Sequence, residues 1–169
     1  LKQHHDLLLL QGTPKEITKE YIARLTRIYD YLAANPPRTD DKKAIADILK
    51  GTTLPPEIVG RLTPWADANV GIRAFIALDP KAFIEKTACP VMAINGEKDM
   101  QVNATDNLNI IRSALKPDKR NLIKAYPGLN HMQQHCTTGS IQEYATIDET
   151  VAPEVLTDVA AWINALKNK

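Results

Sequence analysis

The chain has 169 residues, of which 44% are hydrophobic and 24% are charged, as is typical of a globular protein with a hydrophobic core. Its 21 basic and 20 acidic side chains nearly cancel, and only 5% of the residues are aromatic, so binding to nucleic acid or to an anionic membrane surface gains no support. The longest apolar run, residues 7–10, is too short to cross a bilayer.

The first half of the chain has helical patterns and no convincing strand pattern. A helix is expected from Thr13, because Thr13-Pro14-Lys15-Glu16 reads as a capping box with proline at the first helical position. The apolar residues that follow recur at helical spacing on one face: Ile17, Tyr21, Leu25, Ile28 and Leu32. Further helices are expected over residues 40–50, 58–62, 69–78 and 81–86.

From Cys89 onward, strand and helix patterns alternate. Residues 91–94 and 122–126 are short apolar runs typical of buried strands, with an amphipathic helix expected over 106–115 between them. A last helix is expected from Pro153, with an inner face of Val155, Val159, Trp162 and Leu166. This strand–helix–strand–helix order predicts an α/β fold with a parallel sheet. Because two parallel strands rarely stand alone, further strands are expected upstream of the chain.

Each predicted strand ends in a glycine turn that presents a polar side chain. Gly96 precedes Asp99, and Gly128 precedes His131. An acid and then a histidine on successive loops is the order of the last two members of a Ser–Asp–His triad. His131 would be the general base, and Asp99 would hold its imidazole in the required tautomer. The alternative for Asp99 alone is a cap on the following turn, and for His131 alone a structural role.

The first member of such a triad is missing. The serines of the chain are Ser113 and Ser140, and neither lies in Gly-x-Ser-x-Gly. Cys89 and Cys136 qualify as nucleophiles only by residue type. Cys89 precedes a strand, at the end of the sheet away from the expected site, and Cys136 is interpreted as a small buried residue.

A metal site is not expected. His131 and His135 have the spacing of half a zinc site, but Met132 stands where the His-Glu-x-x-His motif has its glutamate. Two cysteines are also too few for a disulfide framework and lack the spacing of metal ligands.

Residues 79–166 resemble the C-terminal part of the serine α/β-hydrolases, in the esterase-like and acyl-peptidase-like branch. The segment 79–99 resembles that family's penultimate core strand with its acid loop, and 126–131 resembles its final strand end with the histidine loop. Residues 147–163 resemble its closing helix. The resemblance implies a partial α/β-hydrolase fold, with 1–78 as a helical cap and 79–169 as the C-terminal part of the core.

The resemblance also implies a function. The substrate would be a small-molecule carboxylic ester or a similar acyl compound, and no cofactor is implied. The bulky side chains most able to line a pocket under the cap are Tyr21, Tyr29, Trp65 and Phe75, with packing between cap helices as the alternative for each. In the family the nucleophile elbow and the oxyanion-hole loop lie upstream of the matching part. We therefore expect a fragment that does not turn over esters by itself.

Two alternatives stay open. One is a non-catalytic binding or assembly module that forms a homodimer, either through the open strand edge at residues 91–94 or through swapped cap helices. The other is a complete small enzyme that uses Cys136 as nucleophile, or a metal held by His131 and His135.

Overall fold

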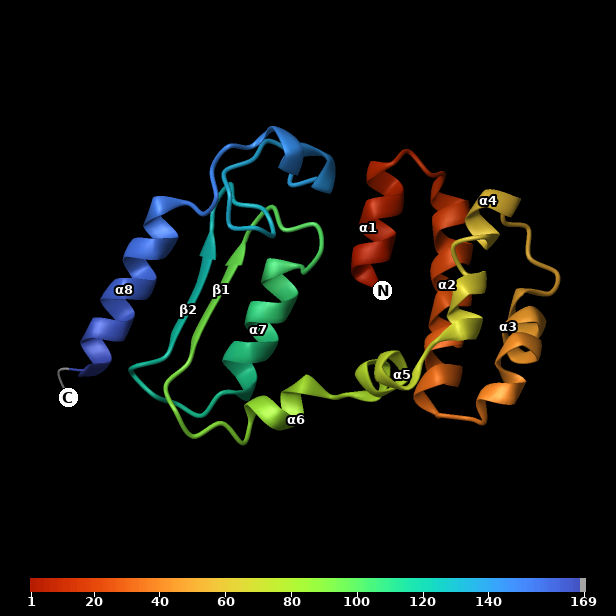
Figure 1. The fold of residues 1–169 in the computed structure, drawn as a ribbon, viewed down its shortest axis with the longest axis horizontal. Helices are drawn as coiled ribbons and strands as arrows, with labels where there is room; N and C mark the ends of the chain where they lie inside the picture. Colours follow the sequence, from red (N-terminus) through yellow and green to blue (C-terminus); the bar gives the residue numbers. More distant parts are fainter. Residues whose placement is uncertain (168–169) are drawn as a thin grey trace. The chain divides into compact units, whose positions relative to one another are not determined.

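The computed structural model describes residues 1–167, and the chain divides into two compact units, Leu1–Leu78 and Asp79–Lys169 (Figure 1). The first unit is helical, and the second contains a small parallel sheet flanked by helices. The α/β class expected from the sequence is therefore confirmed. The more specific α/β-hydrolase fold, and the interpretation of the first unit as a cap, stay predictions.

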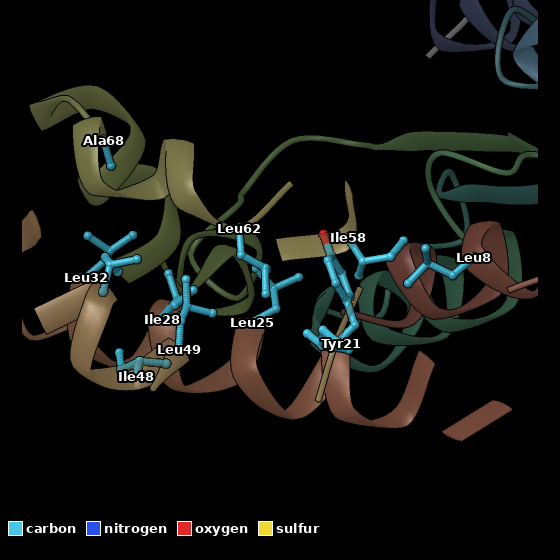
Figure 2. Packing of buried hydrophobic residues seen from close by; sticks show 12 residues of the cluster. Leu8, Tyr21, Leu25, Ile28, Leu32, Ile48, Leu49, Ile58, Leu62 and Ala68 are labelled. Atoms are coloured by element: carbon cyan, nitrogen blue, oxygen red, sulfur yellow. The ribbon is translucent and has the colours of Figure 1, made fainter. Parts of the chain in front are cut away.

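The first unit has no strand among residues 1–78, as expected from the sequence. Its elements are α1 (Lys2–Leu10), α2 (Lys15–Ala33), a 3-10 turn (Arg38–Asp40), α3 (Asp41–Leu49), α4 (Pro56–Val59), a second 3-10 turn (Thr63–Asp67) and α5 (Val70–Ala77). Figure 2 shows the core of this unit, in which Tyr21, Leu25 and Leu32 of α2 are buried together with residues such as Leu62 and Ile58. The helical spacing of apolar residues on α2 thus matches its buried face.

The predicted start of α2 at Thr13 is wrong by a short distance. The helix begins at Lys15, and its N-cap is Pro14, with ψ of 144° and no side-chain capping bond. The backbone N–H of Thr13 instead donates to the carbonyl oxygen of Leu8 (2.9 Å), just after Gly12 with φ of +79°. Thr13 therefore ends the turn that closes α1, an element without a clear signal in the sequence.

Glu20 on α2 binds the loop that precedes α4. Its carboxylate accepts hydrogen bonds from both threonines of that loop, from the Thr53 hydroxyl and from the Thr52 hydroxyl (2.8 Å), and also from Arg24 Nη2 (3.2 Å). The hydrogen bond from the Thr53 side chain, followed by that from Thr52, lowers the pKa of Glu20 from 4.5 to about 2.

The stability of the first unit is therefore expected to depend on Glu20 in acid. Because the folded-state pKa is depressed, the contribution is complete above about pH 4.5 and is lost as the pH falls to about 2. In thermal unfolding followed by circular dichroism, Glu20→Gln should unfold at a lower temperature than the wild type above pH 4.5. The difference should shrink as the pH approaches 2. A difference that is constant across this window would contradict the assigned hydrogen bonds.

The second unit contains α6 (Pro80–Ile84), β1 (Met92–Gly96), α7 (Ala104–Ala114), β2 (Leu122–Tyr126), a 3-10 turn (Ile141–Thr146) and α8 (Pro153–Lys167). The strands pair in parallel, from Met92 opposite Leu122 to Gly96 opposite Tyr126. β2 has the predicted bounds, whereas β1 lies slightly later than the predicted 91–94. α7 begins earlier than the predicted residue 106, because Asn103 is its N-cap and accepts the backbone N–H of Asp106 (2.9 Å).

α8 is fixed to β2 by one carboxylate and by a small apolar cluster. Asp158 Oδ2 accepts hydrogen bonds from Tyr126 Oη (2.7 Å) and Lys124 Nζ (2.5 Å), and burial raises the pKa of Tyr126. Val155 is buried and Val159 packs against the same cluster, while Trp162 and Leu166 of the predicted inner face are half-buried. None of the helices within residues 1–167 combines the length and apolar character that a membrane crossing requires.

Candidate functional site

The loops that follow β1 and β2 lie together at the carboxyl end of the sheet, as Figure 1 shows. The backbone N–H of Glu97 donates to Tyr126 O, and that of Lys98 donates to Leu129 O, both at 2.9 Å. Gly96 allows this close approach, since a Cβ built there would lie 2.2 Å from Leu129 O. The two loops are therefore joined by hydrogen bonds between their backbones, independently of any side-chain contact.

This arrangement brings Asp99 and His131 into contact. Asp99 Oδ2 lies 2.9 Å from His131 Nδ1. The Asp99 side chain is only 2% exposed, whereas that of His131 is 38% exposed. A buried carboxylate thus meets one ring nitrogen, and the imidazole stays open to solvent on another side.

The Asp99 carboxylate is held from several directions. Oδ1 accepts the backbone N–H groups of Gln101 (2.7 Å) and Val102 (2.8 Å). Oδ2 accepts the Asn95 side-chain amide (3.3 Å) in addition to facing His131. Asp99 therefore caps the turn through one oxygen and orients the histidine through the other, so the two interpretations of this residue are compatible.

His135, the second histidine of the loop, is held by carboxylates. Its Nδ1 lies 3.0 Å from Glu149 Oε2, and its Nε2 lies 3.1 Å from Glu154 Oε1. The hydrogen bond to Glu149 is the main cause that raises the pKa of His135. Among residues 1–167 no group of three or more histidine, cysteine, aspartate and glutamate side chains is arranged to hold a metal ion.

The four candidate nucleophiles differ in their surroundings. Cys136 is half-buried, its thiol donates to Gly128 O (3.3 Å), and burial raises the pKa of that thiol, which disfavours the reactive thiolate. Cys89 is exposed. The hydroxyl of Ser113 donates to Ile110 O (2.9 Å) within α7, and that of Ser140 accepts a backbone N–H at the start of a 3-10 turn. Neither serine lies on a strand-to-helix turn.

The aromatic residues predicted to line a pocket all belong to the first unit. Tyr21 is buried in its core. The rings of Tyr29 and Trp65 contact each other edge to face, with centroids 4.9 Å apart. Phe75 is 78% exposed on α5. The structure thus brings Tyr29 and Trp65 together, and a pocket role for any of the four stays a prediction.

Several polar residues around the pair had not been singled out from the sequence. Asn95 supports Asp99 from the end of β1, and Asn130 and Gln134 are buried within the histidine loop. The sequence gives only a weak indication of these roles, because an asparagine next to a glycine turn, or next to a candidate catalytic histidine, is also common in ordinary loops.

A scan against models of protein families, a search of curated proteins and a search of solved structures each find no match to this chain.

Proposed function

We propose that the second unit provides the acid and the base of a serine hydrolase of the α/β-hydrolase type, which acts on carboxylic esters or similar acyl substrates. The main support is the 2.9 Å contact between His131 Nδ1 and Asp99 Oδ2 at the shared carboxyl end of β1 and β2. A buried carboxylate on one nitrogen of a half-exposed imidazole is what the base of a catalytic triad requires.

In this proposal Asp99 holds the proton on Nδ1, so that the lone pair of Nε2 is available. Nε2 would take the proton of a hydroxyl as that hydroxyl attacks the carbonyl carbon, and would then return the proton to the leaving group. Asp99 would stabilise the imidazolium formed between these steps. Among residues 79–167, Nε2 of His131 has no hydrogen-bond partner that would block this role.

The nucleophile and the oxyanion donors are proposed to come from outside these 169 residues, as they would in a fragment of such an enzyme. The Ser113 hydroxyl is hydrogen-bonded within α7, that of Ser140 caps a 3-10 turn, and Cys136 is disfavoured by the raised pKa of its thiol. Loss of an oxyanion donor alone costs about 3–4 kcal/mol of transition-state stabilisation. The chain alone is therefore not expected to turn over p-nitrophenyl acetate faster than its His131→Ala variant.

Acylation of the histidines tests directly whether the lone pair of His131 Nε2 is available, as the proposal requires. Diethyl pyrocarbonate reacts with an imidazole nitrogen that has a free lone pair, so His131 is expected to be modified faster at its Nε2 than His135, whose ring nitrogens both face carboxylates. Peptide mass spectrometry over a time course measures both sites in one sample.

The matched variant is Asp99→Asn, whose side-chain amide can donate to Nδ1 of His131 and so leave the ring proton on Nε2. This loss of the Nε2 lone pair should slow the modification of His131 and leave that of His135 unchanged. Equal rates at the two histidines in the wild type, or no effect of Asp99→Asn, would contradict the proposal.

A second candidate function is an assembly module that forms a homodimer. β1 and β2 pair only with each other among residues 1–167, so each strand has an outer edge without a neighbouring strand. Such edges are templates for pairing with another copy. In sedimentation equilibrium this candidate predicts a dimer, and a monomer at all concentrations would contradict it.

A further inference from the structure

The loop that holds His131 reverses direction within a few residues. Leu129 and His135 form an isolated antiparallel bridge, and the backbone N–H of Asn130 donates to Gln134 O (2.9 Å). Gln133 lies at φ of +59°, a conformation that costs about 1–2 kcal/mol for a residue other than glycine. A loop of this shape needs other contacts to hold it.

Asn130 supplies those contacts from inside the loop. Its side chain is completely buried. Oδ1 accepts the backbone N–H groups of Met132 (2.9 Å) and Gln134 (3.0 Å), and Nδ2 donates to Gln134 Oε1 (3.0 Å). The residue before His131 is thus bonded through Oδ1 to two backbone N–H groups after it, and through Nδ2 to the side chain of Gln134.

The histidine loop is also hydrogen-bonded to the segment that leads into α8. Gln134 Nε2 donates to Glu149 O (2.7 Å), and the backbone N–H of Ala152 donates to Gln133 O (2.8 Å). The backbone on both sides of His131 is therefore held by a buried amide pair and by bonds to Glu149 and Ala152.

We infer that Asn130 is a positioning residue that, with Gln134, holds His131 against Asp99. The inference rests on the proposed function, since it assigns a role at the same site. An amide is required because the site uses an acceptor for two N–H groups and a donor for Gln134 Oε1. Aspartate keeps only the acceptor, and leucine of similar size keeps neither.

The test follows the hydrogen-bonded Nδ1 proton of His131 by NMR in the full chain labelled with ¹⁵N-histidine. Asn130→Leu is expected to lose this resonance to exchange with water. The matched control is Asn121→Leu: Asn121 also makes two bonds, to Val91 N (2.9 Å) and Lys116 O (3.1 Å), but at the start of β2. The control should retain the resonance.

A resonance of wild-type intensity in Asn130→Leu, or an equal loss in both leucine variants, would overturn the inference. If Asn130→Leu does not fold, Asn130→Asp replaces it: this variant lacks the donor to Gln134 Oε1, so the resonance should weaken, and wild-type intensity would overturn the inference. Asp99→Ala separates the two proposals. If this variant keeps the resonance, the proposed function fails, whereas the asparagine variants address the positioning role alone.

Discussion

Replacement of Gly96 by alanine is expected to destabilise the second unit strongly and to separate the two candidate site residues. The added Cβ would lie 2.2 Å from Leu129 O and 2.5 Å from Asn130 O, and backbone atoms cannot rotate away as a side chain can. The loops after β1 and β2 would have to move apart, which breaks the bond from Lys98 N to Leu129 O. We expect a loss at the upper end of the roughly 1–3 kcal/mol that overpacking costs.

Urea unfolding measures this loss, and Gly128→Ala is the matched control in the same unit. A Cβ at Gly128 meets no atom within 4 Å, so only its φ of +74° opposes alanine, at a cost of about 1–2 kcal/mol. If Gly96→Ala were as stable as the wild type, the close approach of the two loops would be wrong.

Replacement of Arg73 by leucine is expected to have the largest effect on the first unit. Arg73 on α5 forms an ion pair with Asp41 on α3, and both side chains are only 2% exposed. Asp41 also accepts the hydroxyl of Tyr31 (3.2 Å), while Arg73 Nη1 donates to Pro36 O (3.3 Å). Removal of the arginine leaves a buried carboxylate without its counter-charge, which costs about 3–5 kcal/mol.

The double variant Asp41→Leu/Arg73→Leu separates the cost of an unpaired buried charge from the cost of changed packing. Because it removes both charges, it should be much more stable than Arg73→Leu alone, close to the wild type. Thermal unfolding of the three proteins measures the difference. If Arg73→Leu were as stable as the wild type, Asp41 would not be buried as described.

The strands and most helices were predictable because their signals are local. The run 122–126 is apolar except for Lys124 and is bounded by polar and turn residues, and β2 occupies those positions. Asn69 and Asp79 cap α5 and α6, because their side chains accept the backbone N–H groups of Ile72 and Lys81, both at 3.0 Å. Thr13 was misassigned because a capping box can be read from the sequence, whereas the competing bond to Leu8 depends on a preceding helix.

The Asp99–His131 pair was predictable for a topological reason. Parallel neighbouring strands end at the same edge, so polar residues on their following loops come close together wherever the strands pair. The supporting residues were not predictable in the same way. Asn130 and the ion pair of Arg73 with Asp41 are polar groups whose burial depends on partners distant in the fold, and no periodic pattern indicates such partners.

The tautomer of His131 tests the central claim, that Asp99 orients this histidine as a base. In ¹⁵N NMR spectra of the neutral form, the wild type should have its proton on Nδ1, which faces Asp99 Oδ2 at 2.9 Å. In Asp99→Asn the amide can donate to Nδ1, so the proton should move to Nε2, while the spectrum of His135 stays unchanged. The same His131 tautomer in both proteins would contradict the claim.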